Sequence, residues 1–412
     1  MKFPDLDALA SVVGISDIQL CDSVAIVGTQ HLLETTGSLA RKLFDVGLPP
    51  TNLYLLGKVY STHESTAETI RSLGATVFSG SSPAKPGTFA YAIREDARSL
   101  WAEFLRNFRR NPVSMVIVLD DGGSMRATIP SIVREKCKVV GIEQTTFGIG
   151  RHPLWNDNDR LPVINVASTA AKRVYETPMI IAAILRRAKE LVINSSGRCG
   201  IVGLGKIGLE LFRELDRKGF DVHAFDRNEE RMEMVPTLSR AKSAQDCVAK
   251  AEFVFGCVGG DGLEQCDLTS VSGPCSFASC SSGDVEFQSL LTGELQWTRQ
   301  GRICPDLLAT NTKSQLKVLR SGFPINFDNS NESVPAKEIQ LTRGLLLAAV
   351  LQARALMNHP PIKAMNRTMM LLPKYQQAVV RSWAQSSGRL DLSIKELDWF
   401  ESESKGVLIE IA

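Results

Sequence analysis

Three glycines and an aspartate near the middle of the chain have the spacing that phosphate and ribose recognition requires. Gly203, Gly205 and Gly208 follow a short apolar run at residues 199–202 and open a segment with helical periodicity. Glycines there permit a tight turn and close backbone approach, and the helix N-terminus offers unpaired N–H groups to a pyrophosphate. Asp226 ends a second apolar run about twenty residues further on, where a carboxylate can accept from a ribose 2′-hydroxyl. The pattern predicts a dinucleotide-binding fold that holds NAD.

The residues around this turn refine the prediction. Lys206 and Ile207 lie inside the turn and belong to the predicted cofactor site. Asp226 favours NAD over NADP because a carboxylate repels a 2′-phosphate, whereas the adjacent Arg227 would attract one. The alternative is a tight strand-to-helix turn that binds no ligand.

The first half of the chain must supply whatever the cofactor acts on. Six short β-rich runs recur there with helical segments between them, which predicts a parallel sheet covered on both faces. The expected fold class is α/β, with two Rossmann-like, doubly wound parallel-sheet domains. Such sheets bind ligands beyond the carboxyl ends of their strands. The runs are residues 24–29, 52–57, 75–80, 115–122, 138–144 and 162–166, and the polar residues at their ends are His31, Asp120, Asp121, Glu143, Gln144, Thr145 and Thr146.

Composition excludes several classes of function. The 412 residues are 44% hydrophobic, which is enough for two domain-sized cores. Basic and acidic residues nearly balance, 47 against 45, without a Lys/Arg run, so neither a nucleic acid nor a membrane surface is expected as a partner. The nine cysteines contain no C-x-x-C pair and the five histidines are widely spaced, so no metal site is predicted. We find no signal-peptide pattern, and a cytoplasmic location is expected.

Six motifs, in order, resemble those of the S-adenosylhomocysteine hydrolase family over nearly the whole chain at low identity. The glycine turn stands between the fifth and the sixth motif. Because several motifs occur in the family's order, the resemblance is more specific than any single motif. The motifs are QHLLETTGSLARKL with His31, KVYSTHES (58–65), LDDGGSM (119–125), GIEQTTFG (141–148), PVINVASTAAKRVYET (162–177) and SSGDVEF (281–287).

This resemblance implies a chemistry and a domain organisation. In the family, bound NAD oxidises the 3′-hydroxyl of a nucleoside, the C4′ hydrogen becomes removable, and the 5′ substituent is eliminated before the ketone is reduced again. The implied substrate domain is residues 1–180 with 340–400, the NAD-binding Rossmann domain is 185–338, and 401–412 is a short tail. The implied hinges lie near residues 177–181 and 338–341. The implied partners are a small-molecule nucleoside and identical subunits, in a homodimer or homotetramer.

The resemblance also assigns roles to residues. Lys172 corresponds to the lysine that takes the 3′-hydroxyl proton, His31 and Asp121 to the pair near C4′ and C5′, and Glu176 to an acid that contacts the ribose. The alternatives are a surface lysine, a satisfied core histidine and a simple strand-end turn. The implied substrate-binding residues are Thr35, Thr36, Ser61, Thr62, Gln144 and Ser282. The implied cofactor residues, besides those of the glycine turn, are Thr145, Thr146, Thr177 and Asn326.

Departures from the family's pattern concentrate at the two ends of the substrate. Thr35 replaces a Glu or Gln that reads the base, and Ser282 replaces a histidine on the 5′ side. Between these ends, Gln144 replaces a glutamate that hydrogen-bonds the ribose. The chain also lacks the family's K-x-D-x-Y-R-Y tail, so NAD is expected to be held more loosely. Three functions stay open: a lyase or dehydratase with an altered substrate, a genuine S-adenosylhomocysteine hydrolase, and an inactive NAD-binding regulator.

Overall fold

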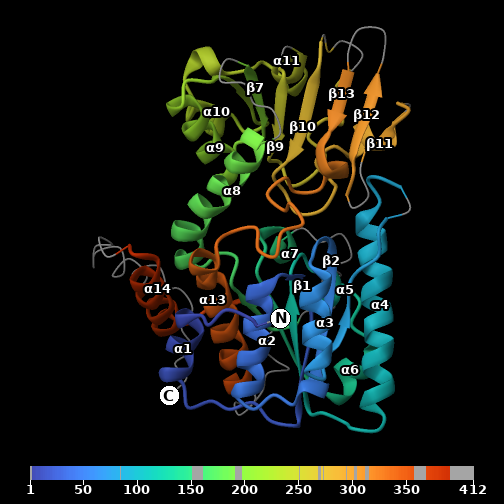
Figure 1. Ribbon diagram of the computed structural model, residues 1–412, viewed down its shortest axis with the longest axis vertical. Coiled ribbons are helices and arrows are strands. Elements are labelled where there is room, and N and C mark those ends of the chain that lie inside the picture. Colours follow the sequence, from blue (N-terminus) through green and yellow to red (C-terminus); the bar gives the residue numbers. More distant parts are fainter. Residues whose placement is uncertain are drawn as a thin grey trace. The chain divides into compact units, whose positions relative to one another are not determined.

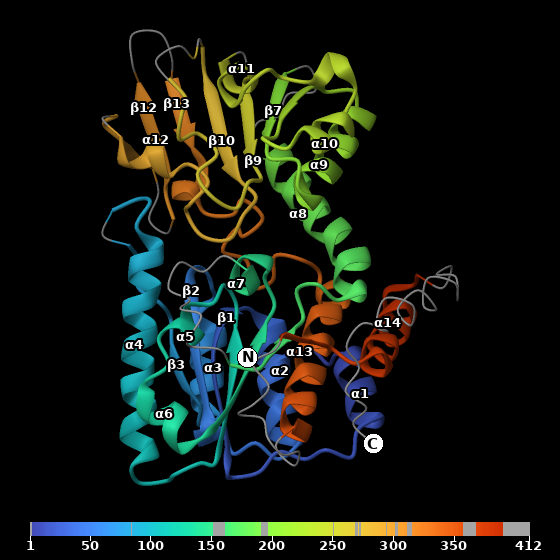
Figure 2. The same ribbon diagram turned by 180° about the vertical axis from the view of Figure 1, so that it is seen from behind.

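The computed structural model describes residues 2–83, 85–150, 161–190, 197–249, 251–267, 271, 273–293, 295–300, 304–310, 315–356 and 368–389. The chain forms two compact units, which Figures 1 and 2 show from opposite sides. Unit 1 comprises residues 1–81, 93–176 and 329–412, and unit 2 comprises residues 82–92 and 177–328.

Unit 1 is built on a seven-stranded sheet in the order β14-β6-β5-β4-β1-β2-β3. Every neighbouring pair is parallel. All six runs predicted in the first half of the chain are strands of this sheet, while β14 comes from a late segment that the sequence did not indicate. The bounds are β1 Val24–Leu32, β2 Leu53–Thr62, β3 Thr76–Phe78, β4 Met115–Asp120, β5 Lys138–Glu143, β6 Val163–Asn165 and β14 Thr368–Met370.

The strand order of unit 1 reverses direction once. From β1 the chain steps outward to β2 and β3, and then returns to β4 on the other side of β1. Right-handed crossovers in opposite directions place helices on opposite faces, so the sheet is doubly wound. Ligands of such sheets bind beyond the carboxyl ends of the strands at the reversal. In unit 1 this point lies between β1 and β4, where Gly28 pairs with Leu119.

The helix α13 forms much of the core of unit 1. It packs against α1, α2 and α14 and against β4 and β5. Among the described residues it is the one helix long and apolar enough to span a membrane, and 83% of its most apolar window is buried inside the protein. The bounds are α1 Asp7–Gly14, α2 Glu34–Asp45, η1 Pro50–Asn52, α3 Glu64–Ser72, α4 Phe89–Phe108, α5 Ser124–Ala127, α6 Ser131–Lys136, α7 Thr146–Gly150, η3 Lys172–Glu176, α13 Ala336–Leu356 and α14 Pro373–Ser387.

Unit 2 has a second seven-stranded sheet, in the order β11-β12-β13-β10-β9-β7-β8. The strands β13, β10, β9, β7 and β8 are parallel, and β12 is antiparallel to both of its neighbours. The bounds are β7 Arg198–Val202, β8 Asp221–Phe225, β9 Phe253–Gly256, β10 Cys275–Ser279, β11 Thr298–Gln300, β12 Asp306–Thr310 and β13 Gln315–Val318. The helices are α8 Thr177–Glu190, α9 Lys206–Arg217, α10 Glu229–Glu233, η4 Thr237–Ser239, α11 Ala244–Ala249, α12 Gln288–Thr292 and η6 Leu319–Gly322.

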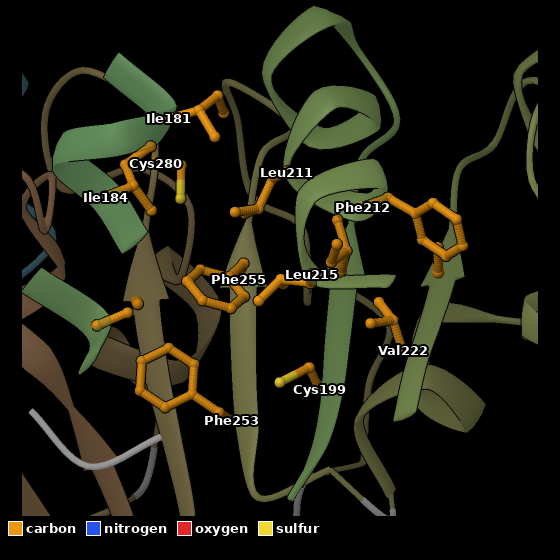
Figure 3. Close-up of a cluster of buried hydrophobic side chains, with 14 of the residues drawn as sticks. Ile181, Ile184, Cys199, Leu211, Phe212, Leu215, Val222, Phe253, Phe255 and Cys280 are labelled. Carbon is orange, nitrogen blue, oxygen red and sulfur yellow. The ribbon is translucent and has the colours of Figure 1, made fainter. Parts of the chain in front are cut away.

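Both faces of this second sheet are buried. Figure 3 shows the cluster on one face, in which Phe253 and Phe255 of β9 pack with Leu211 and Leu215 of α9. The intervening residue, Val254, belongs to the cluster on the opposite face. Side chains alternate across a strand, so a run that is apolar at every position is expected where both faces are covered. The predicted fold class of two Rossmann-like parallel-sheet domains is confirmed.

The division into units differs in detail from the boundaries expected from the sequence. Residues 82–92, expected in the substrate domain, belong to unit 2, because Asp284 accepts a hydrogen bond from the Phe89 amide at 3.2 Å and the Phe89 and Phe323 rings lie 5.2 Å apart. The second crossing falls at 328/329 rather than near 338, because the Asn331 carbonyl accepts from the Glu34 amide at 3.1 Å. The predicted tail at 401–412 lies outside the described residues.

Candidate functional site

A serine, a histidine and an aspartate form a hydrogen-bonded row at the strand reversal of unit 1. His31 lies near the end of β1, Ser61 near the end of β2, and Asp121 directly after β4. The Ser61 Oγ is 2.5 Å from the His31 Nδ1, and the His31 Nε2 is 3.1 Å from the Asp121 Oδ2. Neighbouring parallel strands deliver their carboxyl ends to one edge, so the topology itself brings the three residues together.

Asp121 is also bound by two further side chains. The Lys58 ammonium pairs with Oδ1 and the Gln144 amide donates to Oδ2. Burial tends to raise the pKa of Asp121, but Lys58 and His31 outweigh it and hold this pKa well below its usual range. Burial likewise tends to lower the pKa of Lys58, and the Asp121 carboxylate reverses this and raises it. The pair is therefore an ammonium and a carboxylate inside the protein.

The protonation of His31 follows from its two neighbours. Burial lowers the pKa of His31, and the Asp121 carboxylate offsets only part of this effect, so the ring is neutral near pH 7. An ionised carboxylate can only accept, so the Nε2 of His31 carries the proton. Its Nδ1 is then the acceptor, and the Ser61 hydroxyl donates to it. A neutral imidazole with its lone pair on Nδ1 is suited to take up a proton on the side where Ser61 lies.

A second group of polar residues lies beside this row. The Lys172 ammonium donates to the main-chain oxygen of Gln144 at 2.5 Å and lies 3.3 Å from the Glu176 Oε2. The other oxygen of Glu176 accepts from the Thr342 hydroxyl at 2.6 Å. The side-chain oxygen of Gln144 is buried and has no hydrogen-bond partner among the described residues. A buried polar atom of this kind calls for a partner, and a ligand hydroxyl could be one.

At the start of α2, Thr35 joins an acid and an arginine from a distant segment. The Glu332 Oε2 accepts from the Thr35 hydroxyl at 2.6 Å and from its amide at 3.1 Å. The Arg343 Nε donates to the same hydroxyl at 3.0 Å. Burial lowers the pKa of Arg343, which Glu332 and Asp121 partly restore. Thr35 itself carries no charge, but the Glu332 carboxylate lies within hydrogen-bond distance of it.

Beneath the row lies a buried ionic cluster. Arg126 donates to the Glu143 Oε2 at 2.6 Å and lies 3.6 Å from the Asp120 Oδ2. Burial raises the pKa of Glu143 to about 7, with Arg126 opposing the rise. Thr145, predicted to contact the cofactor or ribose, donates its hydroxyl to the Glu143 Oε1 at 2.7 Å. Asp120 and Glu143 are the last residues of β4 and β5, so this cluster holds the ends of the two strands together.

In unit 2 the glycine turn has the geometry of a phosphate cradle. Gly203 has φ +98°, and a Cβ on it would lie 2.7 Å from the Cys257 carbonyl carbon. A Cβ on Gly208 would lie 1.9 Å from the Gly203 oxygen, so β7 and α9 can meet only with glycine there. Gly205 is the N-cap of α9, and a Cβ on it would have nothing within 4 Å. The turn is closely packed on the protein side and open where a ligand would approach.

Asp226 lies beside this turn. Its Oδ2 accepts from the Leu204 amide at 2.6 Å and lies 3.3 Å from an Arg231 nitrogen. Arg227 points elsewhere, 3.8 Å from the Glu264 carboxylate, with its side chain 69% exposed. The residues therefore fit NAD: the turn and the N-terminus of α9 would hold the pyrophosphate, and Asp226 would accept from the adenosine ribose.

An acidic residue that the sequence analysis did not single out lies next to the turn. Glu286 accepts from the Val258 and Gly259 amides at 3.1 and 2.6 Å and from the Ser281 hydroxyl. Burial raises the pKa of Glu286 to about 7. Through these hydrogen bonds Glu286 anchors the loop after β9, and β9 is the neighbour of β7 in the sheet, at the point where the strand order reverses. The final glutamate of the SSGDVEF motif is its only sequence signal.

The structure places the predicted residues in two groups. Unit 1 brings together His31, Thr35, Thr36, Ser61, Thr62, Asp121, Gln144, Thr145, Thr146, Lys172 and Glu176. Two of them serve the backbone locally: the Thr36 hydroxyl donates to the His31 carbonyl at 2.5 Å, and the Thr62 hydroxyl to the Lys58 carbonyl at 2.8 Å. Unit 2 contains the glycine turn with Lys206, Ile207, Asp226 and Arg227, and also Thr177, exposed Ser282 and buried Asn326.

Sequence reasoning missed Lys58, Glu332 and Arg343. Lys58 had a signal, because it is a charged residue inside the apolar run LYLLGKVYS. The other two come from segments about three hundred residues away from Thr35, and only the fold reveals the contact. Within the described residues, no group of three or more His, Cys, Asp or Glu side chains could hold a metal ion.

Comparison with known proteins identifies the cofactor domain. Residues 198–265 match the family described as the NAD binding domain of 6-phosphogluconate dehydrogenase. This match covers β7, the glycine turn, α9, β8 and β9. The predictions of an NAD-binding Rossmann domain and of NAD as the cofactor are confirmed. The resemblance to S-adenosylhomocysteine hydrolase rests on the motifs alone.

Relatives of known sequence or structure do not define the activity. An uncharacterised protein of Mycobacterium tuberculosis, in strains H37Rv and CDC 1551 / Oshkosh, is 30% identical over 335 residues, which are 81% of this chain and 64% of the relative. The chain therefore spans less than two thirds of that relative's length. Dipicolinate synthase A chain of Bacillus subtilis is similar with 12% identity and a TM-score of 0.41, over 82% of this chain and 99% of that one. The NAD+-bound 3-phosphoglycerate dehydrogenase of Entamoeba histolytica has 9% identity and a TM-score of 0.34, over 84% and 100%.

Proposed function

We propose that the protein is an NAD-dependent enzyme that acts on a nucleoside by 3′-oxidation, C4′ deprotonation and elimination at C5′. In this proposal unit 1 binds the nucleoside and unit 2 binds NAD. The observation that carries it is the set of largely buried ionisable side chains, each at most 16% exposed, at the strand reversal of unit 1, namely His31, Asp121, Lys172 and Glu176. Ionisable side chains with shifted pKa values cluster at ligand-binding sites, and the carboxyl edge of a doubly wound sheet is where its ligands bind.

Binding of the sugar would rest on Glu176 and Gln144. Among the described residues, each oxygen of Glu176 has one partner, Thr342 or Lys172, and a carboxylate oxygen can accept more than one hydrogen bond. The side-chain oxygen of Gln144, which has no partner in the described part of the chain, supplies another acceptor nearby, since the Gln144 main chain also binds Lys172. Two acceptors beside one lysine suit a vicinal diol, which is the part of a ribose that carries the 2′- and 3′-hydroxyls.

Proton transfer at the 3′-hydroxyl would belong to Lys172. Bound NAD supplies a reversible hydride acceptor for the C3′ carbon. Lys172 would take the hydroxyl proton as a neutral amine, and Glu176, whose Oε2 lies 3.3 Å from the Lys172 Nζ, would stabilise the ammonium that results. Lys172 returns the proton when the ketone is reduced, so no net proton is consumed in this half of the cycle.

Proton transfer at C4′ and C5′ would belong to His31. Asp121 already accepts from Lys58, His31 and Gln144, so it acts through the histidine rather than on the substrate. The Nδ1 lone pair of His31 would take up the proton of the Ser61 hydroxyl while that hydroxyl oxygen takes the proton from C4′. The same imidazole would then protonate the group that leaves C5′.

The altered residues favour a substrate other than S-adenosylhomocysteine. Thr35, at the position that reads the base in the family, is tied to Glu332 and Arg343. Ser282 replaces a histidine on the 5′ side, which favours a small leaving group such as hydroxide. A site without partners for a substrate's polar groups discriminates against it by about 1 to 3 kcal/mol for each buried group.

The experiment incubates the protein and NAD with S-adenosylhomocysteine and with a panel of adenine and other nucleosides, followed by mass spectrometry. A 4′,5′-unsaturated nucleoside is the expected product. Homocysteine release as the fastest reaction would identify a genuine hydrolase, and NAD binding without any product would identify an inactive homologue. Lys172→Met should slow NAD reduction roughly 10² to 10⁴-fold. Lys189→Met, an exposed lysine of α8, is the matched control and should leave the rate unchanged.

A further inference from the structure

Lys58 is a buried cation to which the reaction described above gives no role. It lies on β2, its side chain is 4% exposed, and its ammonium pairs with the Asp121 Oδ1. The other oxygen of the same carboxylate accepts from the His31 Nε2 at 3.1 Å. Lys58 and His31 therefore compete for one carboxylate, from its two sides. Burying an ammonium costs free energy of desolvation, and the neighbour on which the charge of Lys58 acts, besides Asp121, is His31.

We propose that Lys58 is a positioning residue that keeps Asp121 ionised and His31 neutral, with the proton of His31 on Nε2 and its lone pair on Nδ1. The proposal rests on the proposed function for the part that His31 plays in proton transfer. The charge and tautomer of His31 can nevertheless be measured without any substrate.

The electrostatic argument compares the pair with Asp121 alone. With Lys58 present, the carboxylate is neutralised and His31 faces an ion pair that attracts a second proton only weakly. Without Lys58, the same buried carboxylate would have His31 as its nearest cation, and the imidazole would gain a proton to pair with it. An imidazolium has no lone pair, so it could not accept from Ser61 or take up a proton from a substrate.

Other groups around His31 do not replace Lys58. On β2 the Ser61 hydroxyl binds Nδ1, and the Tyr60 ring lies edge-on at 5.9 Å. From α13 the Arg343 guanidinium adds a positive charge that further lowers the pKa of His31, but it donates to Thr35. After β5, Gln144 donates to Asp121 and carries no charge. Lys58 is thus the cation in direct contact with the carboxylate that holds the histidine.

The test is nitrogen-detected NMR titration of the histidines, with the His31 signal assigned from His31→Gln. The chain has five histidines, so the spectrum is simple. In the unaltered protein, His31 should be neutral at pH 7 with its proton on Nε2. In Lys58→Met its pKa should rise by about one unit or more, because one neighbouring charge of the ion pair is lost. His223, which pairs with Asp221 in unit 2, is the internal control, and its signals should be the same in both proteins.

A double variant keeps the test decisive if Lys58→Met fails to fold. In Lys58→Met/Asp121→Asn both charges are removed, and a neutral pair is better tolerated inside a protein than a single charge. His31 should again be neutral at pH 7 in this variant. The proposal is overturned if His31 of the unaltered protein is charged or carries its proton on Nδ1 at pH 7. It is also overturned if Lys58→Met folds with an unchanged His31 titration, or if His31 is charged at pH 7 in the double variant. Absence of any nucleoside reaction would instead refute the proposed function and leave these titrations unaffected.

Discussion

Gly208→Ala should damage both the stability of unit 2 and its affinity for NAD. The new Cβ would lie 1.9 Å from the main-chain oxygen of Gly203, whereas real Cβ contacts do not fall below 3.0 Å. The oxygen belongs to the backbone, so no side-chain rotation can relieve the contact. The helix α9 must therefore move away from β7 by about 1 Å or more.

The size of each effect follows from what that movement disturbs. Leu211 and Leu215 of α9 pack in the core shown in Figure 3, and overpacking at such a contact costs about 1 to 3 kcal/mol of unfolding free energy. The displaced N-terminus of α9 would also misalign its N–H groups with the pyrophosphate. A hydrogen bond to a charged group contributes about 1.5 to 3 kcal/mol, so loss of one raises the Kd for NAD roughly 10- to 100-fold.

Two measurements, the thermal midpoint and the calorimetric Kd for NAD, separate packing from ligand contact. Gly205→Ala is the matched control, because Gly205 has φ −64° and a Cβ there meets nothing within 4 Å. This control should keep its midpoint and lose affinity only through crowding of the ligand. Gly208→Ala should lose both. An unchanged midpoint and an unchanged Kd in Gly208→Ala would refute the reasoning.

Three further predictions concern charge. NAD should bind more tightly than NADP because Asp226 lies beside the glycine turn and would repel a 2′-phosphate; equal calorimetric affinities would show that a nearby arginine sets the preference. Arg126→Met should lower the free energy of unfolding in urea by about 3 to 5 kcal/mol, since it removes the cation that pairs with buried Glu143, whereas exposed Arg98→Met should change it by less than about 1 kcal/mol; equal losses would contradict this. The Glu286 pKa of about 7 lies above its ordinary 4.5, so its stabilising contribution is complete below pH 4.5 and is lost as pH rises through 7, on the order of 3 kcal/mol. Glu286→Gln should flatten urea-unfolding stability between pH 5 and 8, and an unaltered slope would assign the dependence to another group.

The sequence was most informative where local pattern and tertiary structure agree. The runs beginning at Val24 and Met115 are apolar at consecutive positions because both faces of the sheet are covered, and this pattern is visible without a fold. The glycine turn was equally predictable, because Gly203 and Gly208 are required by local sterics and Gly205 leaves open space for a ligand. In contrast, β14 is three residues long and joins an edge, so its residues carry little pattern of their own.

The candidate site was predictable only in part. His31, Asp121 and Lys172 were identified from motifs, since His31 lies near the end of β1, Asp121 follows β4 and Lys172 opens η3. The contacts of Thr35 with Glu332 and Arg343 join residues 297 and 308 positions apart, and no local pattern encodes such a pairing. The charge state of His31 could not be predicted from the sequence either, because it depends on Lys58, which lies on a different strand.

The interleaving of the two units along the chain has a consequence for biosynthesis. Residues 177–328 form a nearly continuous unit 2, whereas unit 1 receives α13 only after all of unit 2 has been made. Until then the side of β4 and β5 that α13 covers has no helix to bury it. Since domains fold as units while the ribosome extends the chain from its N-terminus, we expect the later unit to mature first. Unit 1 of the nascent chain then has apolar surface exposed until α13 is made. A chain arrested near residue 328 should therefore be bound by chaperones and cleaved by proteases, even though its NAD-binding unit 2 is already folded.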